Sequence, residues 1–186
     1  MKKFNMTTKI FYIHGFGSSV DSPTLKLLQE TFPQAIGLTY DYTDPFGSLI
    51  KLSREVNQYS IGEHVVTVGS SLGGWYAEQL TDRVVADFIL YNPATNPSLS
   101  LAKYSVDQEV LYKYKQYQLY RQYLPSASRT VILSEDDEVI DHNCARIKYE
   151  LNSDIIRTDG GHRMTPTNMK IITDKIKYLE NQIGND

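Results

Sequence analysis

The stretch from residue 65 to residue 77 constrains the fold of this chain more than any other. It begins with β-branched residues typical of a buried strand, passes through Gly69-x-Ser71-x-Gly73, and continues into a helical pattern. Glycines two residues before and after the serine keep Cβ atoms out of a turn that must be tight and strained. The pattern predicts a strand, a sharp turn and a helix, with Ser71 exposed at the helix start as a candidate nucleophile.

Alternating strands and helices surround this turn. Short apolar runs predict strands at residues 10–13, 36–42, 65–68, 84–90, 131–133 and 155–156. Helical spacing of apolar residues, with proline near three of the starts, predicts helices at about 23–32, 44–62, 72–80, 144–151 and 166–183. This order predicts the α/β class: a mostly parallel sheet of about six strands with helices on both faces.

The segment from about residue 95 to residue 128 breaks the alternation. It carries six tyrosines among lysines and one arginine, between two strands that a shorter connection would join. We interpret it as a small helical cap inserted over the carboxyl edge of the sheet. Its tyrosines either line a substrate entrance, since a ring with a polar tip suits a half-wet surface, or cover the sheet as a solvated helix. With this insertion, residues 1–186 are predicted to form a single domain.

Charge and composition exclude several classes of protein. The net charge of −3 provides no attraction to nucleic acid or to an anionic membrane. The single cysteine, Cys144, cannot form an internal disulfide, and no cysteines and histidines have the spacing of a zinc site. The N-terminal apolar run is too short for a signal peptide, and no stretch approaches the roughly 20 apolar residues that span a bilayer. We therefore expect a cytoplasmic protein with no membrane span and no nucleic-acid partner.

A serine nucleophile needs a base that takes its proton and an acid that orients this base. Such groups gather at the carboxyl ends of the strands in an open parallel sheet. His162 follows the last predicted strand in a glycine-flanked loop, so we expect it to reach Ser71 as general base and acid. His142, in or before a helix, is the weaker alternative. His14 is expected to shape the loop after the first strand, and His64 to lie on the surface at the opposite end of the sheet.

The acidic run at residues 134–141 offers the orienting carboxylate. Asp137 comes shortly after a predicted strand, and the apolar pair Val139-Ile140 behind it would fold the loop back toward the sheet. These features favour Asp137, and the adjacent Asp136 is the rival. The other acids of the run are expected to be solvated or to cap the next helix.

Two backbone N–H groups would complete the site by stabilising a developing oxyanion. Leu72 follows the serine at the start of a helix, where the N–H groups and the helix dipole favour negative charge. Phe16 follows His14-Gly15 in the loop after the first strand and would supply the second N–H. This arrangement needs no metal and no organic cofactor.

These motifs resemble the α/β-hydrolase superfamily and, more narrowly, the small bacterial esterases of the YqiA/YcfP type. The resemblance spans nearly the whole chain and is carried by residues 12–16 with 18–19, 69–77, 92–94 and 137–141. It implies a hydrolase that acts on small-molecule carboxylic esters with short acyl chains, or on thioesters. It also implies that Ser71 is the nucleophile, Asp137 the acid and His162 the base.

Two positions depart from the pattern of that family. Asp136 stands where the family usually has glycine, so the choice between the adjacent aspartates stays open. Arg163-Met164 follow the histidine, where the family often has a small residue and an aromatic one. The sequence thus predicts a serine carboxylesterase that forms an acyl-enzyme. A thioesterase or amidase with the same side chains stays open, as does a catalytically inactive hydrolase-like binding protein. The sequence does not predict the oligomeric state.

Overall fold

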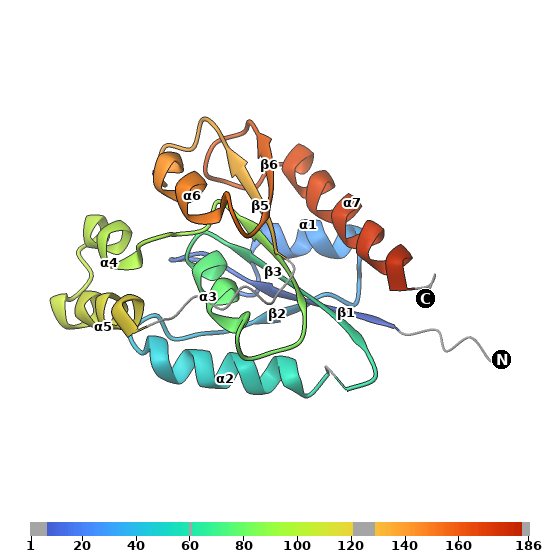
Figure 1. Ribbon diagram of the computed structural model, residues 1–186, viewed down its shortest axis with the longest axis horizontal. Helices are drawn as coiled ribbons and strands as arrows, with labels where there is room; N and C mark the ends of the chain where they lie inside the picture. Colours follow the sequence, from blue (N-terminus) through green and yellow to red (C-terminus); the bar gives the residue numbers. More distant parts are fainter. Residues whose placement is uncertain (1–6, 60, 121–128, 184–186) are drawn as a thin grey trace.

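The protein is a parallel sheet of six strands between two layers of helices (Figure 1). The computed structural model describes residues 7–59, 61–120 and 129–183. Its strands are β1 (Thr8–Ile13), β2 (Ile36–Leu38), β3 (His64–Ser70), β4 (Asp87–Tyr91), β5 (Arg129–Ser134) and β6 (Asp154–Thr158). Its helices are α1 (Pro23–Thr31), α2 (Pro45–Asn57), α3 (Leu72–Leu80), α4 (Pro97–Ser100), α5 (Gln108–Tyr120), α6 (His142–Tyr149) and α7 (Pro166–Ile183), with a 3-10 turn η1 (Leu101–Tyr104). The predicted α/β class is confirmed.

The helices begin where the sequence provides caps. Pro23 opens α1 behind Ser22, whose hydroxyl accepts the amide of Leu25 at 3.3 Å. Asp44 precedes Pro45 at the start of α2 and accepts an amide of its first turn. Proline at the first helical position lacks only an N–H that would have no helical partner there, so it favours a helix start. The predicted helix boundaries at these positions are confirmed.

Three elements are shorter than the sequence predicted. β2 ends at Leu38 rather than residue 42, because the chain leaves the sheet and the Tyr40 hydroxyl instead donates to the carbonyl of His14 at 3.0 Å. β4 begins at residue 87 rather than 84, because the amides of Arg83 and Val84 turn back to the carbonyl of Leu80. Likewise, α2 ends at residue 57 rather than near 62.

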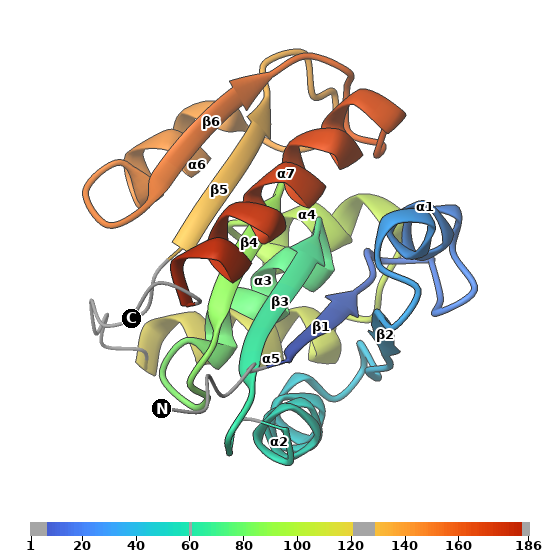
Figure 2. The ribbon, with the colours of Figure 1, turned by 90° about the vertical axis from the view of Figure 1, so that its right-hand side faces the viewer.

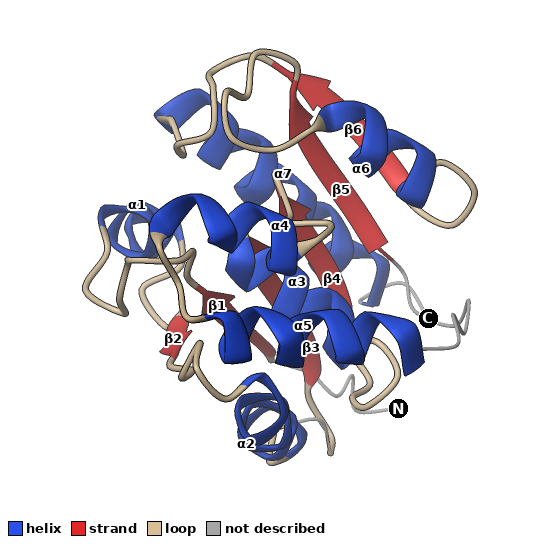
Figure 3. Ribbon diagram, turned by 90° about the vertical axis from the view of Figure 1, so that its left-hand side faces the viewer, coloured by secondary structure: helices blue, strands red, loops and turns tan. Residues whose placement is uncertain are grey.

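The two faces of the sheet pack against different helices. Ile10 and Tyr12 of β1 pack with apolar residues of α1 and α7, which lie together on one face (Figure 2). Phe11 and Ile13 alternate with them and pack with residues of α2, α3, α5 and α6 on the other face (Figure 3). This alternation follows from the two-residue period of a strand and explains why the strands read as unbroken apolar runs. In the described ranges, no helix has the length and apolar character needed to cross a membrane.

The strand order reverses at one position of the sheet, between β1 and β3. The strands lie in the order β2-β1-β3-β4-β5-β6, so the chain runs outward from β1 to β2 and then returns to the other side of β1 as β3. At such a reversal the loops after neighbouring strands diverge, and open α/β sheets bind their ligands there. Ile13 pairs with Gly69, so the loop that begins at His14 starts beside Ser70 and Ser71.

Candidate functional site

Ser71 lies in the turn between β3 and α3, in a backbone conformation that residues with side chains rarely adopt. Its φ is +53° and its ψ is −120°. The end of β4 and the loop after it hold Ser71 there. The Ser71 amide donates to the carbonyl of Tyr91 at 3.0 Å, and the Ser71 carbonyl accepts the amide of Ala94 at 2.9 Å. The loop after β4 therefore fixes the strained turn.

The glycines around Ser71 permit close approaches between backbone segments. A methyl group at Gly69 would collide with the carbonyl of Gly73 and the Cβ of Ala77. A methyl group at Gly73 would collide with the carbonyl oxygens of Ile13 and His14. The start of α3 thus packs directly on the backbone that leaves β1, and the glycines have the steric role that the sequence predicted.

The side chains of Ser71, His162 and Asp137 form a continuous chain of hydrogen bonds. His162 Nε2 lies 3.0 Å from Ser71 Oγ, and His162 Nδ1 lies 2.8 Å from Asp137 Oδ2. An ionised carboxylate only accepts, so the network assigns the ring proton to Nδ1 and leaves Nε2 to accept from the hydroxyl. The His162 side chain is 17% exposed and that of Asp137 is 0% exposed. The structure therefore brings together three residues that are 91 and 25 positions apart in the chain.

Three hydrogen bonds, from the His162 ring and from two backbone amides, hold Asp137 in its ionised form. Its Oδ1 accepts the amides of Val139 at 2.7 Å and Ile140 at 2.9 Å, while Oδ2 faces His162. Burial alone would raise the pKa of Asp137, but the hydrogen bonds from His162, Ile140 and Val139 outweigh it and hold the pKa below the ordinary value of 3.8. The loop folds back at Val139-Ile140, and their amides thereby orient the Asp137 carboxylate toward the imidazole.

The two acids that flank Asp137 bind backbone rather than the imidazole. Asp136 Oδ1 accepts the amides of Gly160 at 2.9 Å and Gly161 at 2.8 Å. Glu138 is exposed, as expected, and also accepts the amide of His162 at 3.0 Å. Asp141 caps α6, as expected.

The other histidines have different surroundings. The ring of His14 is buried and stacks on Tyr40 with centroids 4.7 Å apart, and its Nδ1 donates to the carbonyl of Gly15. Burial lowers the pKa of His14, which fits a neutral residue that shapes the loop. His64 lies at the opposite edge as predicted, but it is less exposed than expected, because it bonds Asp87 at 2.7 Å. The side chain of His142, at the start of α6, lies outside the described part of the structure.

Phe16 and Leu72 belong to the two backbone segments next to the Ser71 side chain. Leu72 follows Ser71 as the first residue of α3. A methyl group on Gly15 would lie 3.2 Å from the Cβ of Ser71, so the loop that carries Phe16 passes next to the serine side chain. Within the described residues, neither amide donates a hydrogen bond to another protein group.

The loop that carries His162 is also held by Asn92, which the sequence places after a strand without giving it a role, and by Tyr91 and Asn168. Asn92, with φ of +42°, donates its Nδ2 to the carbonyl of Gly161 at 3.0 Å and accepts the amide of Ser134 at 2.8 Å. The buried Tyr91 hydroxyl accepts Asn168 Nδ2 at 2.9 Å and lies 3.2 Å from the carbonyl of Gly161. An asparagine at a strand end, before a proline, is a signal for such a left-handed position. Asn168, inside α7, gives no comparable signal.

The tyrosines of the segment between β4 and β5 occupy different environments. Tyr114 is buried and stacks edge-on against Trp75 of α3, and its hydroxyl bonds that of Tyr76 at 2.9 Å. Burial raises the pKa of Tyr114, which keeps it neutral. Tyr117 also stacks on Trp75. These tyrosines cover α3 rather than line an entrance. The side chain of Tyr120 and residues 121–128, which complete the predicted insertion, lie outside the described residues.

Tyr104 of η1 lies instead next to the loop that carries Phe16. The ring centroid of Phe16 lies 5.4 Å from that of Tyr104 and 5.0 Å from that of Tyr42. Tyr104 is 51% exposed. The neighbouring Lys103 donates to the carbonyl of Val139 at 3.3 Å. The 3-10 turn thus connects the loop after β1 with the loop that carries the acid.

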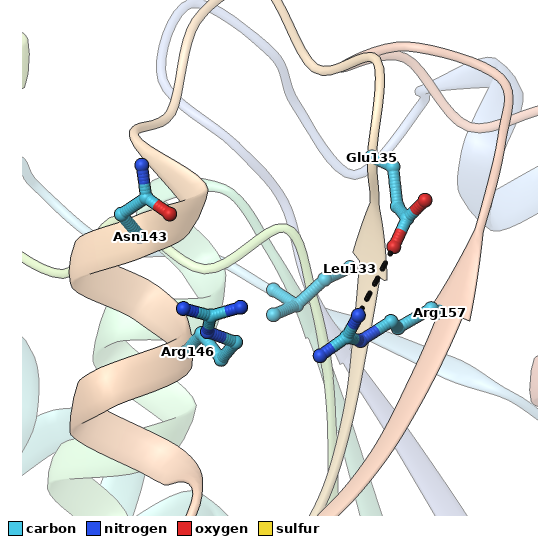
Figure 4. Close-up of a pocket in the computed structure, with 5 residues that line it drawn as sticks. All are labelled: Leu133, Glu135, Asn143, Arg146 and Arg157. Atoms are coloured by element: carbon cyan, nitrogen blue, oxygen red, sulfur yellow. Dashed lines mark hydrogen bonds and ion pairs between the residues drawn. The ribbon is translucent and has the colours of Figure 1, made fainter.

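A separate hollow of about 300 Å³ lies between α6 and the strands β5 and β6 (Figure 4). It is lined by Leu133, Glu135, Asn143, Arg146 and Arg157, and Glu135 pairs with Arg157 at 3.4 Å. Its lining does not include Ser71, His162 or Asp137. In the parts of the chain that the structure describes, no three histidine, cysteine, aspartate or glutamate side chains gather in a way that would hold a metal ion.

Comparison with known proteins identifies the family. Residues 9–179 match the family described as Uncharacterised protein family (UPF0227). The chain belongs to the UPF0227 family. This match confirms the resemblance to proteins of the YqiA/YcfP type that its motifs predicted.

Several solved structures share the fold. A protein from Xanthomonas campestris pv. campestris, assigned as a hydrolase of the α/β superfamily, is 18% identical with a TM-score of 0.66, over 91% of this chain and 98% of that one. A protein from Agrobacterium vitis S4, assigned as a hydrolase, is 14% identical with a TM-score of 0.75, over 95% and 89%. Est1E from Butyrivibrio proteoclasticus is 15% identical with a TM-score of 0.69, over 98% and 90%. The UPF0227 chain therefore has the α/β-hydrolase fold.

The contacts of Asp137 predict a pH-dependent contribution to stability. Its folded pKa lies below that of an unfolded aspartate, so the ionised form stabilises the fold above about pH 4, and this contribution is lost as the pH falls through the folded pKa. We expect Asp137→Asn to lower the free energy of unfolding by a constant amount between about pH 6 and 8, and by less below about pH 4. Urea unfolding across this range measures the difference.

The exposed Asp21, in the loop before α1, provides the control. Asp21→Asn should leave the free energy of unfolding unchanged throughout. A difference between wild type and Asp137→Asn that persists undiminished to about pH 3 would contradict the account of this carboxylate.

Proposed function

We propose that this UPF0227 protein is a serine hydrolase that cleaves carboxylic esters through an acyl-enzyme. The proposal depends chiefly on the hydrogen-bonded chain from Ser71 through His162 to Asp137, with distances of 3.0 and 2.8 Å. A nucleophile within hydrogen-bond reach of a base, and a base oriented by a buried acid, is the arrangement that activates a hydroxyl. A protein that only binds a ligand does not need a nucleophile, a base and an acid in hydrogen-bonding positions. The arrangement therefore favours catalysis over a catalytically inactive binding protein.

Acylation follows from the positions of these groups. As Ser71 Oγ attacks the carbonyl carbon of the ester, His162 Nε2 takes the hydroxyl proton. The carboxylate of Asp137 stabilises the imidazolium, and the N–H groups of Phe16 and Leu72 receive the oxyanion. When the tetrahedral intermediate collapses, His162 gives its proton to the leaving alkoxide oxygen, and an alcohol departs. The acyl group is then joined to Ser71.

Deacylation repeats these steps with water. His162 takes a proton from the water as its oxygen attacks the acyl carbonyl, and the same two N–H groups stabilise the oxyanion. Collapse returns the proton to Ser71 Oγ and releases the carboxylic acid. Every proton transfer thus passes through His162 Nε2, which lies 3.0 Å from Ser71 Oγ in the structure.

Proteins of the same fold support the choice of esters. Est1E from Butyrivibrio proteoclasticus has been solved with ferulic acid bound, and an esterase from Pyrococcus furiosus has a TM-score of 0.57 to this chain. Identities are 15% and 14%, so the argument from these proteins is one of analogy within a fold that hosts many reactions.

Ser71→Ala should lower the rate of p-nitrophenyl acetate hydrolysis at least about 10³-fold, because the attacking oxygen is removed. A fluorophosphonate should label the wild type at Ser71 and fail to label this variant. Circular dichroism should show that the variant stays folded.

Ser70→Ala is the matched control, because the Ser70 hydroxyl bonds Tyr12 at 2.8 Å instead of His162. It should keep both hydrolysis and labelling. Wild-type activity in the Ser71→Ala variant, or equal labelling of the two, would rule out Ser71 as the nucleophile.

Tyr104 should influence which acyl groups are accepted, because its half-exposed ring lies against Phe16 beside the proposed oxyanion site. We expect Tyr104→Ala to raise kcat/KM for p-nitrophenyl hexanoate relative to acetate by about 10-fold, the effect of one or two methylene contacts in a binding site. Kinetics with p-nitrophenyl esters of two to twelve carbons measure this ratio. Tyr112→Ala, which removes a ring on α5 that is 60% exposed, should leave the ratio unchanged; an equal change in both variants would contradict this role.

A further inference from the structure

We infer that Asp136 and Glu138 are positioning residues that hold the loop of His162 in the place from which its imidazole reaches Ser71. This inference rests on the proposed function, since it assigns a task to the two acids on either side of the proposed triad acid. The hydrogen bonds of the two side chains go to backbone amides rather than to the Ser71 hydroxyl or the imidazole.

The contacts between the two loops form a regular series. Three successive acids, residues 136–138, bind three successive residues, 160–162. Asp136 accepts the amides of Gly160 and Gly161, and Glu138 accepts the amide of His162. Asp137, between them, accepts from the His162 ring. The acid loop therefore fixes both the backbone and the side chain of the proposed base.

The loop of His162 needs such external support because it has few anchors of its own. Gly160 and Gly161 have φ values of +120° and +70°, a region that glycine adopts easily and that leaves the backbone free to rotate. Neither residue has a side chain that could pack. On the opposite side, Asn92 binds the carbonyl of Gly161. The Gly161 residue is thus held by its N–H from the acid loop and by its C=O from the loop after β4.

The charge of the acids makes these contacts stronger than ordinary backbone hydrogen bonds. A carboxylate that accepts amides forms charge-assisted bonds, which are roughly twice as strong as neutral ones. Asp136 and Glu138 are exposed, and none of the three residues whose amides they accept is fully buried.

Loss of either acid should affect the chemical step rather than substrate binding. A displacement of about 1 Å between a base and its nucleophile can lower a rate by about 10²-fold. We therefore expect Asp136→Ala and Glu138→Ala to lower kcat for p-nitrophenyl acetate by about 10-fold each, with KM changed less than about twofold. Asp136→Asn and Glu138→Gln, whose amide oxygens still accept, should retain most of kcat.

Glu135→Ala is the matched control, because Glu135 belongs to the same acidic run but its carboxylate pairs with Arg157. It should keep the kcat of the wild type. Wild-type kcat in both Asp136→Ala and Glu138→Ala, or an equal fall in Glu135→Ala, would overturn the inference.

A second measurement needs no substrate and separates this inference from the proposed function. In ¹H–¹⁵N NMR spectra, amide protons that bind a carboxylate shift when the carboxylate titrates. Asp136→Asn should abolish the acid titration of the Gly160 and Gly161 amides, and Glu138→Gln should reduce that of the His162 amide. Unchanged titrations would overturn the positioning role. If the variants lose these titrations as expected but the wild-type protein has no esterase activity, the proposed function would be overturned and the contacts would stand.

Discussion

Ser71 has a backbone conformation that costs roughly 1–3 kcal/mol, and the site exists because the packing around the turn over-determines it. The carbonyl of Tyr91 and the amide of Ala94 hold the turn from the side of β4. On the other side, the absence of a side chain at Gly73 lets the backbone after β1 lie against α3. The packing around this turn thus fixes the direction of the Ser71 hydroxyl, the position of the Leu72 N–H and the path of the loop that carries Phe16.

The imidazole is positioned by a different means, since it lies on a loop with two glycines. Polar contacts from three elements replace the packing that the loop lacks: the acids after β5, Asn92 after β4, and Tyr91 through its hydroxyl. The side of the site that carries the hydroxyl is therefore rigid through close backbone packing. The side that carries the base is held by hydrogen bonds, many of them to charged groups, which are sensitive to pH and to substitution.

Much of this arrangement could be predicted from the sequence because it depends on local patterns. The apolar runs gave the six strands, and parallel alternation placed Ser71, Asp137 and His162 at one edge. The roles of Asp136 and Glu138 could not be predicted. The sequence around an exposed acid does not indicate whether its carboxylate is solvated or accepts an amide 24 residues away in the chain. Likewise, the burial of Tyr114 depends on the partner that α5 meets, which its sequence of alternating tyrosines and lysines does not specify.

The structure of the protein after reaction with a fluorophosphonate tests the central claim most directly. The account predicts a phosphorus atom bonded to Ser71 Oγ, with one phosphonyl oxygen about 2.7–3.1 Å from the amides of both Phe16 and Leu72, the range for an oxyanion donor. The imidazole of His162 should stay within hydrogen-bond reach of the Ser71 oxygen. An adduct on another residue, or a phosphonyl oxygen that faces solvent away from both amides, would contradict the account.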